Sequence, residues 1–421
     1  MRPSEPAVAA PISLFLGKGG VGKSTLAAAT AVAQARAGTR VLLVSTDEAH
    51  SVGDVLGLPV APGEGPVPVL LDEAVAPGRL DALALDTLAL LQQHWRVAVD
   101  VLAARFPDSD LASLAPEELS ALPGVQEVLG LHRVAELAAS ARWDRVVVDC
   151  ASTADALRML TLPPTVALYA ERAWPRHRRL GGNDAAANPL VELIERITSA
   201  AEDLATLLTD TGRVAAHLVL TAERVVAAEA IRTLSSLALT GVRVEELIVN
   251  QFLVQDDSYA YTNLPDHPAF EWYTERIREQ ATVLDSLDAA IGDVAMVLVP
   301  HLAGEPIGPT ALGALIEGSR RRGGSAPPAP VRPVVDRESG SGLGAVYRLR
   351  LELPQVDSGA LRLGRSGDDL IIGSGATRRR IGLASVLRRC IVVDATLRGS
   401  ELTVRFRPDP QVWPSSRAEE V

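Results

Sequence analysis

A glycine-rich stretch near the start of the chain, GKGGVGKST at residues 17–25, holds the residues best suited to chemistry. It contains Lys18 and Lys23, the only two lysines among 41 basic residues. A lysine ammonium is a compact cation on a flexible stem, and it fits between phosphate oxygens where the broad guanidinium of Arg does not. Because Arg fills the other basic positions, we infer that both lysine positions serve a phosphate-bearing ligand.

The spacing within this stretch supports that interpretation. The run from Gly17 to Ser24 matches the phosphate-loop pattern GxxxxGK[ST]. Glycines let backbone N–H groups turn toward phosphate oxygens without a Cβ clash, and a helix that begins near Lys23 points its N-terminus at the same anion. A chance glycine loop could match the pattern, but a strand before it and an aspartate-ending strand downstream favour nucleotide binding.

The pattern assigns a role to each position. We expect Lys23 to contact the β and γ phosphates, Ser24 to ligate Mg²⁺, and Thr25 to lie near the α phosphate. ATP and Mg²⁺ are therefore the predicted cofactors. The other predicted nucleotide-binding positions in the loop are Gly17, Gly19, Gly20, Val21 and Gly22.

Apolar strands and helices must hold this loop in place. Residues 12–16 and 40–46 are apolar runs, and residues 23–37 between them have a helical pattern that ends at Gly38. Strand, loop, helix and strand at this spacing predict a βαβ unit and a parallel sheet. Further strands are predicted at residues 143–151, 214–222, 241–254 and 294–300.

The chain is predicted to contain two domains. Residues 1–320 form an α/β domain, a mostly parallel sheet flanked by helices, and a Pro- and Gly-rich linker follows at 321–336. Short alternating strands separated by Gly and Asp predict a small antiparallel all-β domain at 337–410. Residues 411–421 are a tail.

Composition excludes several functions. The net charge is −11, and Arg outnumbers acidic residues only after residue 331, so the acidic main body argues against nucleic-acid binding. Cys150 and Cys390 are too few for a disulfide framework or a thiolate cluster, which suits a reducing cytoplasm. No apolar run of transmembrane length is present, and the N-terminus is unlike a secretory signal.

The second lysine suggests a family. KGGxGK[ST] marks the deviant Walker A loop, and this stretch resembles that of the MinD and ParA ATPases, the arsenite-pump ATPase ArsA and the eukaryotic tail-anchored-protein targeting ATPases. In that family the early lysine reaches the phosphates of a partner subunit in a nucleotide-sandwich dimer. The resemblance therefore implies that Lys18 acts in trans and that hydrolysis needs a homodimer.

Later segments resemble the ArsA-like branch. STDEAHSVGD at 45–54 is similar to its switch I, which makes Asp54 the carboxylate that orients the attacking water. WDRVVVDCASTADALRMLTLP at 143–163 is similar to Walker B and switch II, which puts Asp149 in the Mg²⁺ shell. The resemblance thus predicts Lys18, Lys23 and Asp54 as catalytic residues, and Ser24, Asp47 and Asp149 as metal ligands.

The resemblance extends over roughly residues 11–318. IVNQ is similar to the adenine-contact segment, so Asn250 is expected to read the purine, and VPHLAGEPIGPTAL is similar to the loop that closes over the base and carries Pro300. The strands at 345–408 resemble the α-crystallin-like domain of small heat-shock proteins, in which SELTVRF is similar to the final strand.

Two functions stay open. One is a Mg-dependent ATPase whose hydrolysis at a homodimer interface drives a membrane-targeting, chaperone or transport-coupled role. The other is a nucleotide-gated chaperone or scaffold with little turnover, which is suggested by Ser152, Ala154 and Asp155 where switch II usually has Pro, Gly and His. An arsenite-efflux ATPase is less favoured, because As(III) needs several thiolates.

A client site is a further possibility. Residues 190–208 have an amphipathic helical pattern, and such a face most often packs on its own domain. Alternatively it forms a groove for a hydrophobic protein client or a membrane-protein segment. The apolar residues on this predicted face are Leu190, Ile194, Ile197, Ala201, Leu204 and Leu208.

Overall fold

The structure is a computed structural model, and it places most of the chain. The residues that it describes are 9–47, 51–71, 78–105, 124–173, 189–253, 266–324, 333–353, 356, 359, 361–374 and 377–413.

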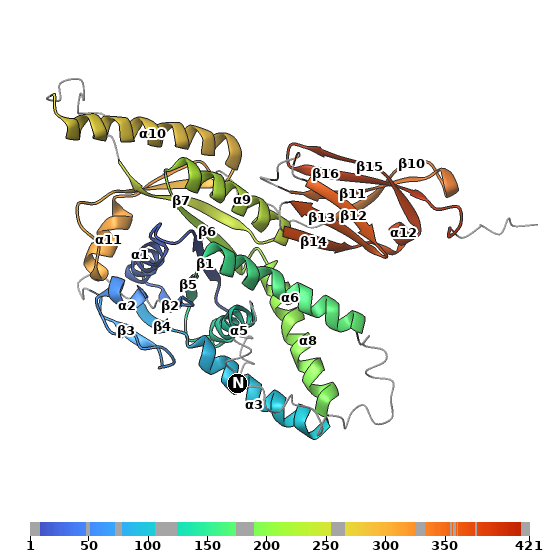
Figure 1. The fold of residues 1–421 in the computed structure, drawn as a ribbon, viewed down its shortest axis with the longest axis horizontal. Helices are drawn as coiled ribbons and strands as arrows, with labels where there is room; N and C mark the ends of the chain where they lie inside the picture. Colours follow the sequence, from blue (N-terminus) through green and yellow to red (C-terminus); the bar gives the residue numbers. More distant parts are fainter. Residues whose placement is uncertain are drawn as a thin grey trace, which may run out of the picture.

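A nine-stranded sheet forms the centre of the first domain (Figure 1). Its order is β3-β4-β2-β5-β1-β6-β7-β8-β9, and every pair is parallel except the two edge pairs β3–β4 and β8–β9. The predicted mostly parallel sheet is confirmed. The strands are β1 Ile12–Gly17, β2 Arg40–Ser45, β3 Val67–Val69, β4 Arg79–Ala84, β5 Arg145–Asp149, β6 Val214–Thr221, β7 Val244–Phe252, β8 Ala295–Pro300 and β9 Arg320–Arg322.

Helices cover both faces of this sheet, so nearly every residue of its central strands β1, β5 and β6 is buried, as continuous apolar runs require. Helices α1, α2 and α11 pack together on one side, and α3, α5, α6, α8, α9 and α10 lie on the other (Figure 1). Their bounds are α1 Lys23–Arg36, α2 Ser51–Leu56, α3 Thr87–Arg105, α5 Val125–Ala139, α6 Thr153–Ala173, α8 Pro189–Leu208, α9 Arg224–Thr240, α10 Pro268–Ile291 and α11 Gly308–Glu317.

The second domain has two antiparallel sheets, as the alternating pattern predicts. One has the order β10-β11-β16-β15 and the other β12-β13-β14, and their inner faces share one apolar core. The elements are β10 Val334–Ser339, the 3-10 turn Gly342–Gly344, β11 Val346–Glu352, β12 Leu361–Ser366, β13 Asp369–Ser374, β14 Thr377–Gly382, α12 Ser385–Arg388, β15 Cys390–Arg398 and β16 Glu401–Pro408.

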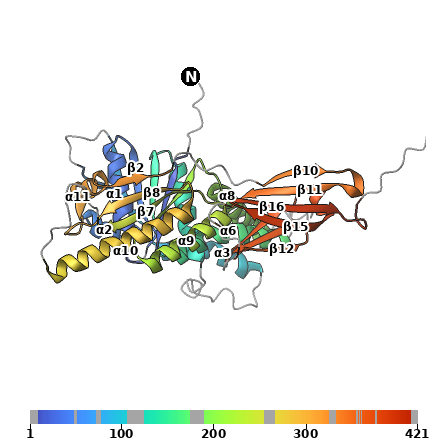
Figure 2. The same cartoon turned by 90° about the horizontal axis from the view of Figure 1, so that it is seen from above.

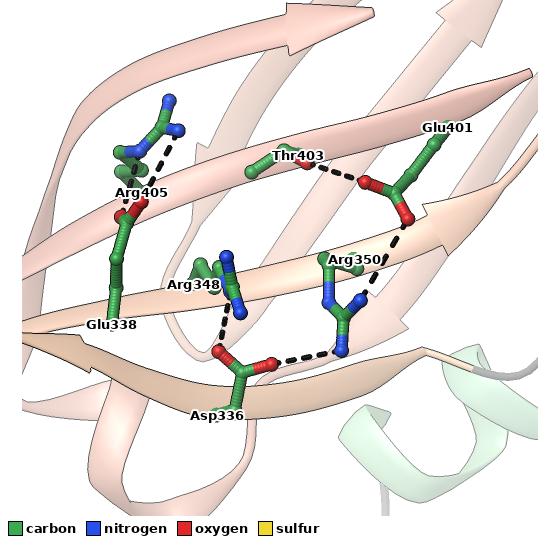
Figure 3. Close-up of polar contacts among 7 residues, drawn as sticks. All are labelled: Asp336, Glu338, Arg348, Arg350, Glu401, Thr403 and Arg405. Atoms are coloured by element: carbon green, nitrogen blue, oxygen red, sulfur yellow. Dashed lines mark hydrogen bonds and ion pairs between the residues drawn. The ribbon is translucent and has the colours of Figure 1, made fainter. Parts of the chain in front are cut away.

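Ion pairs join the strands on the outer face of the four-stranded sheet (Figure 3). Asp336 on β10 accepts hydrogen bonds from Arg348 at 2.5 Å and Arg350 at 3.0 Å, both on β11. Glu338 accepts one from Arg405 on β16 at 2.8 Å. These arginines hold the pKa values of Asp336 and Glu338 below their ordinary range.

The two domains meet at the carboxyl end of α9 (Figures 1 and 2). Ala238 and Leu239 of α9 are buried in the same apolar cluster as the inner faces of the β sheets. Thr377 at the start of β14 also donates a hydrogen bond to Ser236 of α9, with 2.9 Å between the hydroxyl oxygens. A helix of the first domain thus contributes to the core of the second.

Helix α8 forms where its amphipathic pattern predicts, but Ile197 of the predicted apolar face is not buried. The side chain of Leu190, another residue of that face, lies outside the described residues. Ile197 is 51% exposed, whereas the neighbouring Thr198 is buried and donates its hydroxyl to the carbonyl of Ile194. The buried stripe therefore passes through a threonine whose only polar side-chain group is satisfied within the helix. In the part of the chain that the structure describes, no helix has the length and apolarity needed to cross a membrane.

Candidate functional site

The glycine loop lies at the carboxyl end of β1, where it leads directly into α1. A Cβ at Gly17 would lie 2.3 Å from the carbonyl oxygen of Val219, and one at Gly22 would lie 2.3 Å from Nδ2 of Asn250. Gly22 also has a φ of 91°, in the left-handed region. Close approach of other strands therefore explains why these two positions are glycine.

The N-terminus of α1 is open to an anion. Gly22 is its N-cap residue, and no side chain caps the helix there, so its first N–H groups have neither an intrahelical partner nor a capping side chain. No acidic residue is present in the first turn. A phosphate placed at this end would gain both the N–H hydrogen bonds and the positive end of the helix dipole.

The two lysines occupy different positions on the loop. Lys23 is 7% exposed, and its Nζ donates a hydrogen bond to the carbonyl oxygen of Lys18 at 3.3 Å, so the ammonium curls over the loop. Lys18 is about half exposed, and its Nζ lies 3.8 Å from Oε2 of Glu229 on α9. One lysine thus faces into the loop and the other faces outward.

Asp149 ends β5 beside the loop, and its side chain is fully buried. Neither of its carboxylate oxygens accepts a hydrogen bond from any residue that the structure describes. Burial raises the pKa of Asp149 to about 6, a shift that Ser24 and Lys23 oppose and Asp47 reinforces. A buried carboxylate without a donor is costly unless a ligand compensates it.

These residues fit a magnesium ion that is bound together with phosphates. Mg²⁺ is usually held by one or two carboxylates, with water and phosphate oxygens completing the shell. Asp149 supplies two uncommitted oxygens, and the Ser24 hydroxyl is near enough to shift its pKa. No cluster of three or more acidic, His or Cys side chains that could hold a metal occurs among the described residues, and a phosphate-dependent site does not need one.

Ser51, which sequence reasoning missed, also belongs to this site. Its Oγ lies 2.7 Å from Oγ of Ser24, and it is the first residue of α2. The sequence did hold a signal for Ser51, because this residue lies within STDEAHSVGD, the segment that resembles switch I. Residues 48–50 of that stretch lie outside the described residues.

The other predicted site residues are less closely grouped. Thr25 is half-buried in the first turn of α1, and Asp47 is half-buried just beyond β2. Asp54 is exposed on α2, and no described contact joins its carboxylate to the loop. Its predicted role with water remains a prediction.

Asn250 is brought to the loop, where its side chain makes a contact that the sequence did not predict. Its Nδ2 donates a hydrogen bond to the carbonyl oxygen of Val21 at 2.9 Å, and the residue is 7% exposed. It therefore ties β7 to the loop backbone. Pro300 ends the neighbouring strand β8, half-buried, and reading of adenine by either residue remains a prediction.

The departures in switch II form a local network at the start of α6. Ser152 donates its hydroxyl to Asp155 at 2.6 Å, and the Asp155 N–H donates back to the Ser152 hydroxyl at 3.3 Å. Arg158 pairs with Asp155 and with Glu127 on α5. This is a capping arrangement that stabilises the first turn of the helix.

Both cysteines are free thiols that are shielded from solvent. Cys150 follows Asp149 and is 1% exposed, and burial raises the pKa of its thiol. Cys390 is buried in the β domain. The chain's two sulfhydryl groups therefore lie in different cores.

Comparison with known proteins agrees with the geometry. A family model described as anion-transporting ATPase matches residues 11–317, and one described as an HSP20-like domain found in ArsA matches residues 344–406. Protein Rv2184c of Mycobacterium tuberculosis is 69% identical over 409 residues, which cover 96% of this chain and 97% of that protein.

More distant relatives also align. The uncharacterized protein SCO2128 of Streptomyces coelicolor is 34% identical over 420 residues, which cover 96% of this chain and 99% of that protein. An arsenical pump-driving ATPase of Acidiphilium multivorum is 30% identical over 253 residues, which cover 59% of this chain and 40% of that protein.

Proposed function

This chain belongs to the anion-transporting ATPase family, and from that membership we propose that it binds ATP with Mg²⁺ at the glycine loop and hydrolyses it. The observation that carries the proposal is the buried Asp149 carboxylate, whose two oxygens have no hydrogen-bond donor beside an uncapped helix N-terminus. A protein retains such a group where a bound cation compensates its desolvation.

The residues of the loop suit phosphoryl transfer, which depends on positioning and charge neutralisation. Lys23 would turn from the Lys18 carbonyl to the phosphates, and the open N–H groups of α1 would bind their oxygens. When bound, Mg²⁺ would neutralise phosphate charge, held by Ser24 and Asp149, with Asp47 nearby. Asp54 would orient the attacking water.

We further propose that two copies cooperate. Lys18 is exposed at the rim of the loop, and by family resemblance it reaches the phosphates of the second copy. Hydrolysis would then drive opening and closing of a homodimer, in a membrane-targeting, chaperone or transport-coupled role with a hydrophobic protein as client. Free cysteine thiols suit a cytoplasmic location.

A direct experiment measures phosphate release over a range of protein concentrations with Mg²⁺ and ATP. Activity per molecule should rise with concentration if a dimer is the active form. Lys23→Ala should abolish it, whereas Arg36→Ala, at the far end of α1, should not. Equal activity in Lys23→Ala and the unmodified chain would contradict the proposal.

The second candidate is a nucleotide-gated chaperone or scaffold with little turnover. It is favoured by the network of Ser152, Asp155, Arg158 and Glu127, which holds the start of α6 where a switch must move. Tight ATP binding without phosphate release would select it. An arsenite-pump role is less favoured, because the buried thiols of Cys150 and Cys390 lie in separate cores.

A further inference from the structure

Lys18, the lysine proposed to act on a second subunit, is paired within its own subunit. Its Nζ lies 3.8 Å from Oε2 of Glu229, and both side chains are partly exposed. An ion pair of this kind is weak and solvent-screened, so a phosphate group can displace the carboxylate. The ion pair can therefore hold Lys18 in its own subunit reversibly.

The helix that carries Glu229 also carries the docking surface for the β domain. Glu229 lies in the first half of α9, and Ser236 lies about two turns, or roughly 10 Å, further along the same helix. Beyond it, Ala238 and Leu239 are buried in the core of the β domain. The hydrogen bond from Thr377 to Ser236 adds a polar contact at the edge of that core.

Helix α9 is therefore placed to connect the two sites. It is one uninterrupted helix of 17 residues, so a shift of its carboxyl end moves Glu229 as well. It also packs against α6, the helix that follows Asp149. Removing Leu239 from the β-domain core would expose apolar surface, so docking constrains where α9 can lie.

We propose that the docked β domain holds Lys18 in its own subunit through α9, with Glu229 as the positioning residue. Release of the β domain lets α9 shift, which frees Lys18 to reach the second subunit. The inference rests on the proposed homodimeric ATPase, and it gives the appended domain a regulatory task.

The test fixes the docked state in the full chain. The Ser236 and Thr377 hydroxyl oxygens are 2.9 Å apart, so Ser236→Cys with Thr377→Cys places two thiols where a disulfide can form. The native cysteines are both buried and do not compete. Oxidation then locks the docked state, whereas reduction makes docking reversible again, so that the β domain can leave α9. The reduced protein also serves as the folding control.

The readout is the rate of acetylation of Lys18, followed by mass spectrometry without nucleotide. Because the chain has only two lysines, the buried Lys23 is an internal reference. We expect Lys18 to react about two- to fivefold more slowly in the oxidised form than in the reduced form, which is the range of a surface ion pair. Adding Glu229→Gln should remove this difference.

The matched control is Glu223→Gln. Glu223 precedes the same helix but pairs with Arg276 on α10, so it should leave the difference intact. Equal labelling of Lys18 in the oxidised and reduced forms overturns the inference, and so does a difference that persists with Glu229→Gln.

Phosphate release separates this inference from the proposed function. If ATP is hydrolysed but the rate of Lys18 labelling does not depend on the disulfide, the inferred coupling through α9 is wrong and the proposed ATPase function is retained. If labelling follows the disulfide but no ATP is hydrolysed, the proposed function is wrong and the coupling stands. When both hold, oxidation should slow turnover, and Glu229→Gln should restore it.

Discussion

The hydroxyl of Ser24 lies 2.7 Å from the hydroxyl of Ser51, which joins the end of the phosphate loop to the first residue of α2. This contact connects the expected magnesium ligand to the segment that resembles switch I. A movement of the loop upon ligand binding would therefore directly affect the position of α2. The contributions of the two serines can be measured separately by substitution.

The first prediction concerns Ser24 and Ser51. Ser24→Ala should remove the Mg²⁺ dependence of ATP affinity, whereas Ser51→Ala should keep that dependence and lower the free energy of unfolding by about 1 kcal/mol. ATP titrations with Mg²⁺ and with EDTA measure the dependence. Loss of the dependence in Ser51→Ala as well would make Ser51 a ligand in its own right.

The second prediction concerns the pH dependence of stability at Asp149. The pKa of Asp149 in the folded protein, about 6, is above the ordinary value. Its contribution to the free energy of unfolding is therefore favourable at low pH and is lost as the pH rises through 6. At pH 7 the buried charge should cost the ligand-free protein roughly 3 kcal/mol. Asp149→Asn should therefore raise the free energy of unfolding at pH 7 while abolishing Mg²⁺-dependent hydrolysis.

Urea denaturation of the ligand-free protein between pH 5 and pH 7 checks this sign. The gain from Asp149→Asn should grow as pH rises across that range. A gain that does not change with pH would mean that the carboxylate is not desolvated. Asp144→Asn is a suitable comparison, because Asp144 is exposed, and the guanidinium of Arg40 lowers its pKa to about 2.

The third prediction concerns Lys18. Lys18→Arg keeps the positive charge but replaces a compact ammonium by a broad fork, so ATP binding should persist while turnover falls about tenfold or more. Calorimetric titration and phosphate release separate the two effects. Turnover like that of the unmodified chain would refute the role of Lys18 in trans.

The fourth prediction concerns Asn250. Asn250→Asp removes the donor that holds the Val21 carbonyl, so the loop should bind ATP, GTP and pyrophosphate more weakly by a similar factor, about tenfold. Competition binding with the three ligands measures this. If ATP alone is weakened, Asn250 reads adenine and its contact with the loop is secondary.

The fifth prediction concerns acid stability of the β domain. The folded pKa values of Asp336 and Glu338 are lowered, so their contribution is present near neutral pH and is lost as pH falls below about 4. Asp336→Asn should make the β domain less stable at pH 7 and less sensitive to acid. Hydrogen exchange of β10 and β11 between pH 7 and pH 3.5 reports both changes.

The local part of the site followed from the sequence. The order strand, glycine loop, helix and strand is dictated by short-range apolar patterns, and the loop's chemistry is carried by adjacent residues from Gly17 to Thr25. The small antiparallel domain was equally predictable, because alternation with a period of two needs no distant partner to be recognised.

Other predictions failed or fell short where burial is decided by packing. The amphipathic pattern of α8 placed Ile197 on the inner face, but the neighbouring helices cover Thr198 instead. The sequence suggested contact with adenine for Asn250 but did not predict its hydrogen bond to the Val21 carbonyl. That contact depends on how closely β7 approaches the loop.

By itself the sequence determined that a phosphate loop with two lysines begins a parallel α/β domain, since both follow from residue type and spacing. Only the tertiary structure decided which groups surround that loop. It buried the Asp149 carboxylate without a donor, placed Ser51 against Ser24 and set Glu229 beside Lys18. These relationships join segments far apart in the chain, and they exist only because the sheet and its helices pack in this order.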